Sequence, residues 1–321
     1  MNLVALLLLF FLFPMKVQAL ESELERILFP DEITEDMKYI MASNDGQLGN
    51  ACFMAATGIS YALDNGCAFV IDSAAKKKYP EVFQRFPEYS VEKPKRELSH
   101  WANKLYYSKI TKSSLITGCP NSDFWFMRHK DVVVELLGPT EGMKRDLQEK
   151  YSEYLRKDKK YVGLHLRTFV QKGEAKNYYP IGTFQVWGIC PEYYEEAMSL
   201  FPEDSVFVVF SDNIELAKKL LSSFDKEFIF QNDTGMIEDF YLMSMMERMI
   251  IPSSTFAAFA CFLNTNPNKI VVKPENTPAA HMLETNWVVL KSKHLTSGVR
   301  NWHKICRREY QRLGFNKYRF L

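Results

Sequence analysis

Two groups of residues in this chain have side chains suited to bind an anion. His165 and Arg167 stand at the end of one apolar run, and Ser253, Ser254 and Thr255 follow another. An arginine is always charged and presents a planar fork of donors that suits a diphosphate, while hydroxyl groups and helix N–H groups can complete its coordination. The residue types therefore indicate that Arg167, Ser254 and Thr255 hold a pyrophosphate.

The hydroxyl cluster also has a simpler interpretation. Ser253 or Ser254 can be the N-cap of the apolar segment 256–263, which is predicted to be a buried helix. The first turn of a helix has unpaired N–H groups and a positive dipole end, which favour an anion there. Polar groups also end two other predicted strands, at His165-Leu166-Arg167 and at Ser211-Asp212-Asn213. Three unrelated solvated loops would also explain this, but ligands of parallel sheets bind at strand ends, which favours a site.

A third candidate lies near the start of the chain, in the loop Gly46-Gln47-Leu48-Gly49-Asn50. The glycines allow the backbone to approach a ligand closely, and Asn50 can either cap the following helix or donate to a bound sugar or phosphate. Ordinary turn chemistry accounts for a G-x-x-G pair equally well when the pair is considered alone.

The sequence gives no sign of a metal site. No Asp-x-Asp sequence occurs, so the usual short acidic signature of a metal bound to a nucleotide diphosphate is missing. Six cysteines are scattered without C-x-x-C pairs, which argues against zinc, and Cys52 and Cys261 are predicted to be small core residues. We therefore expect no cofactor and no metal, with arginine and backbone dipoles in place of Mg²⁺.

Alternating apolar segments predict the elements that position these residues. A strand at 38–42, a helix at 53–63 and a strand at 68–71 open the chain, as in a doubly wound unit. After a polar run at 157–160 the alternation becomes regular, and it predicts a parallel α/β sheet. Its strands are expected at 161–166, 206–210, 227–230, 249–251 and 270–272, and its helices at 192–200, 214–222, 238–246 and 256–263.

Length and composition are consistent with two domains. The chain has 321 residues, 47% of them hydrophobic, so it is not a disordered protein, and a net charge of +1 gives no general attraction to nucleic acid. We expect an acceptor-side domain at 20–156, a nucleotide-sugar domain at 157–290, and a basic, aromatic tail at 291–321 that packs back on the first domain.

The N-terminus predicts entry into the secretory pathway. Residues 1–19 contain thirteen consecutive apolar residues, too few to span a bilayer, followed by small residues that suit signal peptidase. They are read as a cleaved signal peptide or a short membrane anchor, and a buried helix is the alternative. The expected location is the Golgi membrane or lumen, or outside the cell, and Asn232 in Asn-Asp-Thr is a candidate glycosylation site.

The motifs resemble, in chain order, those of the α-1,2-fucosyltransferases of glycosyltransferase family 11. The matching parts are the glycine loop 46–50, His165-Leu166-Arg167, Ser211-Asp212-Asn213 and the block 243–263 with its Ile-Pro-Ser-Ser-Thr-Phe core. The glycine loop and the His-x-Arg pair also resemble protein O-fucosyltransferases. The resemblance covers residues 39 to 275, and the last block is its most specific part.

The resemblance implies a metal-independent, inverting enzyme with a GT-B-like fold, in which two Rossmann-like domains meet at a cleft. GDP-fucose would be the donor and a galactose-ended glycan the acceptor. Arg167 would hold the β-phosphate beside Ser253, Ser254 and Thr255, with His165 and Asp212 near the nucleotide. Gly49 and Asn50 would contact the donor, with Asn50 facing the fucose, and Arg167 and Asn50 would be the catalytic residues.

The chain also departs from the family pattern. Thr168 stands where a second arginine is usual, and Ala257-Ala258-Phe259 replaces an aromatic pair. Losing one charge-assisted bond costs about 1.5–3 kcal/mol if nothing replaces it. A silent protein that binds a GDP-sugar or a glycan without turnover is therefore the alternative from another class, and the absence of G-x-G-x-x-G argues against an NAD-type oxidoreductase.

Overall fold

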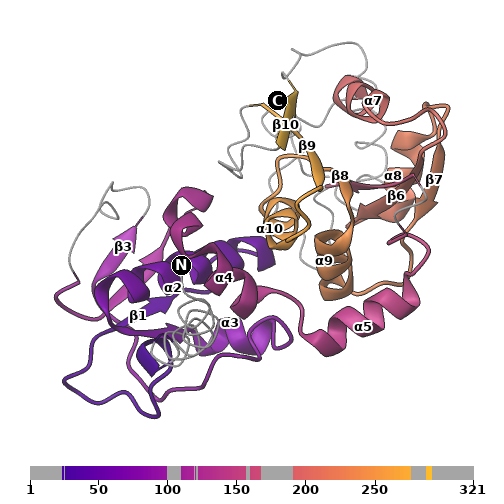
Figure 1. Ribbon diagram of the computed structural model, residues 1–321. Helices are drawn as coiled ribbons and strands as arrows, with labels where there is room; N and C mark the ends of the chain where they lie inside the picture. Colours follow the sequence, from indigo (N-terminus) through magenta and orange to yellow (C-terminus); the bar gives the residue numbers. More distant parts are fainter. Residues whose placement is uncertain are drawn as a thin grey trace, which may run out of the picture. The chain divides into compact units, whose positions relative to one another are not determined.

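The computed structural model describes residues 24, 26–99, 110–118, 120, 122–156, 160–167, 191–275 and 287–290. The chain forms two compact units, coloured indigo to magenta and magenta to yellow in Figure 1. The first unit comprises residues 1–120 and 124–137, and the second comprises 121–123 and 138–321. The predicted signal segment 1–19, Thr168 and the tail 291–321 lie outside the described residues.

The first unit is built on a four-stranded parallel sheet in the order β2-β1-β4-β3. Helix α2 follows the first strand and is buried along most of its length, because its sequence is apolar on nearly every side. Gly66 ends this helix in the left-handed conformation, φ 58°. The described elements are β1 (Tyr39–Ala42), α2 (Leu48–Asn65), β2 (Ala68–Ile71), α3 (Ser73–Lys78), β3 (Glu97–Ser99), β4 (Ser114–Thr117), η2 (Asp123–Trp125), η3 (Met127–His129) and α4 (Lys130–Leu137).

The second unit has a six-stranded parallel sheet in the order β10-β9-β8-β5-β6-β7. The chain starts at β5 in the middle, moves outward through β6 and β7, then returns to the other side of β5 at β8. The described elements are α5 (Glu141–Lys150), β5 (Tyr161–Leu166), α7 (Pro191–Ser199), β6 (Val206–Ser211), α8 (Ile214–Leu221), β7 (Glu227–Phe230), α9 (Met236–Met245), β8 (Arg248–Ile250), α10 (Thr255–Leu263), β9 (Ile270–Pro274) and β10 (Trp287–Leu290).

The central strand β5 is buried on both faces, as parallel strands covered by helices are. Leu164 and Leu166 belong to the core cluster formed with α7 and α8. On the other face, a Cβ atom at Gly163 would lie 2.2 Å from the sulfur of Met249 and 2.9 Å from that of Met246. Glycine therefore allows the methionines to pack against the middle of the sheet.

The predicted α/β class is confirmed, because each unit carries a parallel sheet with helices between its strands. The segment 138–156, which the sequence assigned to the first domain, groups with the second unit instead. Side-chain contacts explain this grouping. Glu238 at the start of α9 accepts hydrogen bonds from Lys150 (2.5 Å) and from the hydroxyl of Tyr151 (2.7 Å), which attach the end of α5 to the second unit.

Candidate active site

The sheet order of the second unit brings two of the predicted groups together. Strands β5 and β8 are neighbours, paired at Gly163 with Met249 and at Leu164 with Ile250. The order of the sheet reverses between these two strands, and a reversal point is where open α/β sheets bind ligands, beyond the carboxyl ends of the strands. The chain leaves β5 at Arg167 and enters the segment of Ser253 and Ser254 after β8.

Arg167 is held in place by an acidic neighbour from the next strand. Strand β6 pairs with β5 so that Leu166 lies opposite Ser211, which puts Arg167 and Asp212 side by side. A guanidinium nitrogen of Arg167 lies 3.3 Å from Asp212 Oδ2, and the two side chains are 17% and 8% exposed. This ion pair places a carboxylate beside a guanidinium that stays partly exposed.

His165 is buried and neutral. Its backbone carbonyl accepts a hydrogen bond from the hydroxyl of Tyr194 (3.1 Å), and its ring lies 5.7 Å from the ring of Phe256, which in turn packs on Phe240. Burial lowers the pKa of His165 to about 3, with a further contribution from the positive charge of Arg167. Nδ1 is buried and has no hydrogen-bond partner within the described part of the chain.

The hydroxyl cluster begins helix α10, which packs against α9 (Figure 1). Ser254 is the N-cap residue, and its hydroxyl accepts a 3.5 Å hydrogen bond from the backbone N–H of Ala257. Ser253 and Ser254 are buried, and Thr255 is the first residue of the helix. The cap prediction for Ser254 is confirmed, and the same helix end points its dipole towards the carboxyl edge of the sheet.

The sequence interpretation missed a carboxyl group at the same edge, Asp239. This residue lies in the first turn of α9, just after strand β7, and its carboxylate accepts a 2.7 Å hydrogen bond from the hydroxyl of Thr234. Burial, and to a lesser extent the charge of Glu238, raises the pKa of Asp239 to about 6. The acidic pair before an apolar helix marks a helix start in the sequence, but burial is visible only in the fold.

The glycine loop of the first unit follows the carboxyl end of β1. Gly46 has φ +88°, and a Cβ atom there would lie 2.3 Å from the side-chain nitrogen of Asn50. The prediction that Asn50 caps the helix is wrong, because α2 begins earlier, at Leu48, and Gln47 is its N-cap residue. Asn50 therefore lies in the first helical turn with Gly49, over the loop backbone, and its proposed contact with a sugar stays a prediction.

Other predicted features are placed as follows. Asn232 is exposed, in the loop between β7 and α9. Cys52 and Cys261 are buried free thiols, as expected of small core residues, and burial raises the pKa of Cys52. In the described residues there is no group of three or more His, Cys, Asp or Glu side chains that could hold a metal ion. Across those same residues, no helix combines the length and apolarity that crossing a membrane requires.

Comparisons with known proteins give two kinds of similarity. The chain is 26% identical to the O-antigen biosynthesis glycosyltransferase WbnK of Escherichia coli over 157 residues, which are 46% of this chain and 49% of that protein. The chain thus spans about half the length of the curated relative it matches. Among solved structures it is similar to the fucosyltransferase NodZ of Bradyrhizobium, with 12% identity, TM-score 0.48 and coverage of 70% and 92% of the two chains. It is also similar to FUT1 of Arabidopsis thaliana, with 15% identity, TM-score 0.45 and coverage of 77% of this chain and 73% of that chain.

The sequence profile of one family, glycosyl transferase family 11, matches residues 85–292. That range is about two thirds of the chain, and it includes the whole edge of the second sheet where Arg167, Asp212 and Ser254 lie. On the strength of the profile match, this chain belongs to glycosyltransferase family 11.

Proposed function

We propose that this glycosyltransferase transfers fucose, with inversion, from GDP-fucose to a galactose-type hydroxyl of a glycan, forming an α-1,2 linkage without a metal ion. Family membership supports the general reaction. The donor and the linkage are proposed from the motifs that resemble the α-1,2-fucosyltransferases, His165-Leu166-Arg167 and the block that contains Ser253 and Ser254.

One observation carries the proposal. A nearly buried arginine lies at the reversal point of a doubly wound sheet, fixed by Asp212, and a helix N-terminus with a hydroxyl cluster follows the neighbouring strand. Donors from Arg167 and from the start of α10 suit the two phosphates of a nucleotide diphosphate. In the proposal Arg167 holds the β-phosphate, while Ser253, Ser254 and Thr255 bind beside it.

The chemistry in the proposal is a single displacement. The oxygen of the acceptor hydroxyl forms a bond to the anomeric carbon of fucose, and the bond from that carbon to the β-phosphate oxygen breaks. The bonding electrons leave with GDP, and a general base accepts the hydroxyl proton. Negative charge therefore grows on the diphosphate as the bond breaks, so a fixed cation stabilises the transition state more than the ground state.

His165 has a different place in the proposal. Because its pKa is about 3, the ring carries no charge near neutral pH and does not help to balance the diphosphate. A neutral imidazole can donate with one nitrogen and accept with the other. We assign it to hydrogen bonding with the nucleotide, beside the positive charge that Arg167 supplies.

The test is a GDP-release assay on the full-length protein, with GDP-fucose alone and with a panel of galactose-ended glycans. Arg167→Lys keeps a charge but loses the planar two-point contact, so GDP should still bind weakly while turnover falls about a hundredfold or more. Turnover of Arg167→Lys equal to the parent's would contradict the assignment. Activity that disappears with EDTA and returns with Mn²⁺ would contradict a metal-free reaction, and GDP binding without release would favour a silent binding protein.

The proposed location is the secretory pathway, in the Golgi membrane or lumen. Residues 1–19 are the reason for this proposal, and the exposure of Asn232 is consistent with a glycosylated sequon. Microscopy of the full-length protein with a Golgi marker tests it. Fluorescence confined to the cytosol would contradict it.

A further inference from the structure

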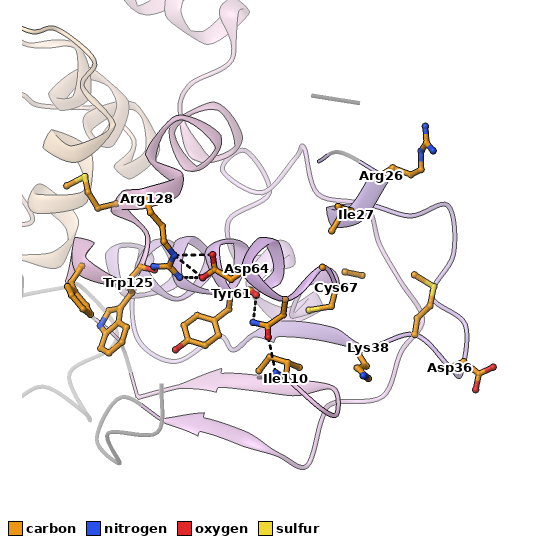
Figure 2. Close-up of a pocket in the computed structure, with 16 residues that line it drawn as sticks. Arg26, Ile27, Asp36, Lys38, Tyr61, Asp64, Cys67, Ile110, Trp125 and Arg128 are labelled. Atoms are coloured by element: carbon orange, nitrogen blue, oxygen red, sulfur yellow. Dashed lines mark hydrogen bonds and ion pairs between the residues drawn. The ribbon is translucent and has the colours of Figure 1, made fainter. Parts of the chain in front are cut away.

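A large pocket lies in the first unit, at the edge of the sheet opposite the glycine loop. It has a volume of about 1240 Å³. Its wall includes Lys38, which precedes β1, Ala68, which begins β2, and the end of helix α2 (Figure 2). The strands of this sheet run parallel, so these are their amino ends, whereas the loop 43–50 follows the carboxyl end of β1. The pocket is therefore separate from the predicted contact of Asn50 with the donor.

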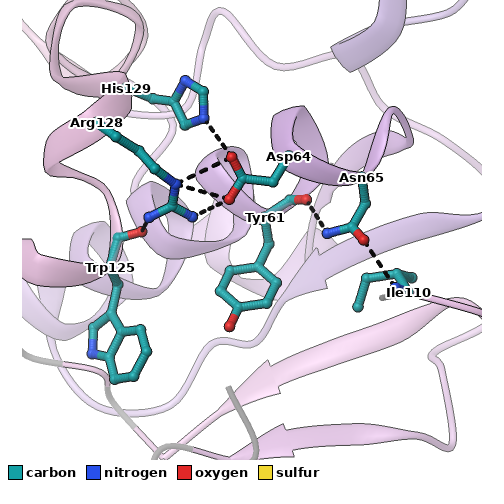
Figure 3. A network of polar contacts seen from close by, with 7 residues as sticks. All are labelled: Tyr61, Asp64, Asn65, Ile110, Trp125, Arg128 and His129. Atoms are coloured by element: carbon teal, nitrogen blue, oxygen red, sulfur yellow. Dashed lines mark hydrogen bonds and ion pairs between the residues drawn. The ribbon is translucent and has the colours of Figure 1, made fainter. Parts of the chain in front are cut away.

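One wall of the pocket carries an array of hydrogen-bonded polar groups (Figure 3). The carboxylate of Asp64 accepts hydrogen bonds from Nε of Arg128 (2.9 and 3.1 Å) and lies 2.8 Å from Nε2 of His129. Arg128 also donates to the backbone carbonyl of Trp125 (2.8 Å). The side chains of Asp64 and Arg128 remain 35% and 44% exposed, so their other edges face the pocket.

The charge of this array is set by its own contacts. Burial by itself raises the pKa of Asp64, but hydrogen bonds from Arg128 and His129 outweigh it and hold the pKa below its usual value. The carboxylate is thus ionised at neutral pH. Its oxygens accept from Arg128 and His129, and its exposed edge can accept a further hydrogen bond beside the donors of the guanidinium. In such a pair the carboxylate can accept a hydrogen bond from one hydroxyl group of a ligand, and the guanidinium can donate to the adjacent hydroxyl group.

The same pocket presents aromatic rings. Phe124 is 42% exposed, and its ring packs edge to face against Trp125, with 5.1 Å between the ring centroids and 82° between the ring planes. Trp125 and Tyr61 also line the pocket and are mostly buried, and the tyrosine ring lies below the Asp64 carboxylate in Figure 3. An exposed ring on a rigid aromatic support is a flat apolar surface that a ligand with C–H faces can cover.

These features together select a ligand class. The charged residues of the wall are mixed in sign, namely Arg26, Asp36, Lys38, Asp64 and Arg128, so a highly charged ligand finds no uniform field. The volume exceeds the range of about 300–1000 Å³ typical of small-molecule pockets, which suits an extended ligand. A neutral molecule with adjacent hydroxyl groups and apolar C–H faces, repeated along a chain, is an oligosaccharide.

We propose that this pocket is a second carbohydrate site, which binds non-reacting sugars of the glycan acceptor through Phe124, Asp64 and Arg128. The part concerning the acceptor rests on the proposed function. The carbohydrate binding itself does not, because it requires neither a donor nor turnover.

The experiment tests carbohydrate binding and the link to the glycan acceptor separately. Lactose and galactose-ended N-acetyllactosamine oligomers of increasing length are titrated into the full-length protein by calorimetry, without donor. The parent should bind the longer oligomers more tightly, and Phe124→Ala should weaken that binding about fivefold to tenfold, as expected for one lost ring contact. Asp64→Asn, which keeps the shape of the side chain, should weaken it as well. Leu200→Ala is the matched control, because Leu200 is 50% exposed and lies in the second unit.

The outcomes are distinguishable. Parent-like oligomer binding by Phe124→Ala and Asp64→Asn, with circular dichroism showing both folded, would overturn the proposal, as would a parent that binds none of the oligomers. Retained binding in Arg167→Lys and loss in Phe124→Ala would support it, whatever the GDP-release assay shows. With GDP-fucose present, the KM of the parent for the oligomer should fall as the oligomer becomes longer. Phe124→Ala should lose this dependence on length. A dependence that persists unchanged in Phe124→Ala would overturn the link to the acceptor.

Discussion

Replacing Asp239 by asparagine should make the second unit more stable, by an amount that grows with pH. The pKa of Asp239 is raised from 3.8 to about 6 in the fold, chiefly by burial, a difference of 6 − 3.8, or about two units. A native state that holds a proton more tightly than the unfolded state loses stability as pH rises between the two pKa values. At 1.36 kcal/mol per unit the loss is about 3 kcal/mol, complete above the folded pKa.

The asparagine variant lacks this loss. Its amide oxygen can still accept the hydrogen bond from Thr234, which is 2.7 Å long in the parent. The free energy of unfolding of Asp239→Asn should thus be close to the parent's near pH 4 and exceed it by about 3 kcal/mol at pH 7 and above. Because two units can unfold separately, urea unfolding is best followed by hydrogen exchange of peptides from α9.

A neighbouring carboxyl group provides a control of opposite sign. Burial raises the pKa of Glu238, but the hydrogen bonds from Lys150 and Tyr151 outweigh it, so the pKa is lowered overall. The stabilisation that ionised Glu238 gives the folded state is present above its unfolded pKa and is lost as pH falls through its folded pKa. Glu238→Gln should therefore be less stable than the parent at neutral pH and approach it in acid. A stability difference for Asp239→Asn that stays constant from about pH 4 to about pH 8 would refute the reasoning.

Three further changes test the second unit. Gly163→Ala places a Cβ atom against two methionine sulfurs and should cost about 1–3 kcal/mol of unfolding free energy by urea denaturation. Gly142→Ala is the control: its Cβ would have no neighbour closer than 3.8 Å and it lies in helix α5, so it should be neutral to slightly stabilising, and an equal loss in both variants would contradict the packing argument. Asp212→Asn removes the charge that fixes Arg167 and should lower turnover about tenfold with a smaller change in GDP affinity; unchanged turnover would mean that Arg167 needs no such partner. Asn232→Gln should remove one glycan from protein made in a secretory host, so that the protein runs faster on a gel and glycosidase no longer shifts its band. Identical mobility of the parent and the variant would show that the exposed sequon is not used.

Local sequence was sufficient to place most elements of the second unit. The strands at 161–166 and 227–230 match β5 and β7 as predicted, and the helices α7, α8 and α10 begin and end within a residue of their predicted limits. The reason is that a short apolar run between polar breaks favours a buried strand, whereas a longer run with helical spacing favours a helix. Ser254 was placed as a cap for the same reason, since capping involves residues only three positions apart.

Three results could not be read from the residues of one segment alone. The start of α2 was missed at Gln47, because a cap without a side-chain hydrogen bond carries no residue signal. Helix α5 joined the second unit through Glu238, nearly ninety positions further along the chain. The burial that shifts the pKa of Asp239 depends on everything packed around α9, and no single segment reveals it.

The candidate site shows the same division. Sequence alone identified Arg167 and the hydroxyl cluster, because their chemistry belongs to the side chains themselves. The return of the chain from β7 to β8, on the far side of β5, puts them at the ends of neighbouring strands. The register of β5 against β6 puts Asp212 beside Arg167. Strand order and register follow from how whole faces of the sheet are buried, so only the tertiary structure brings these residues to one edge.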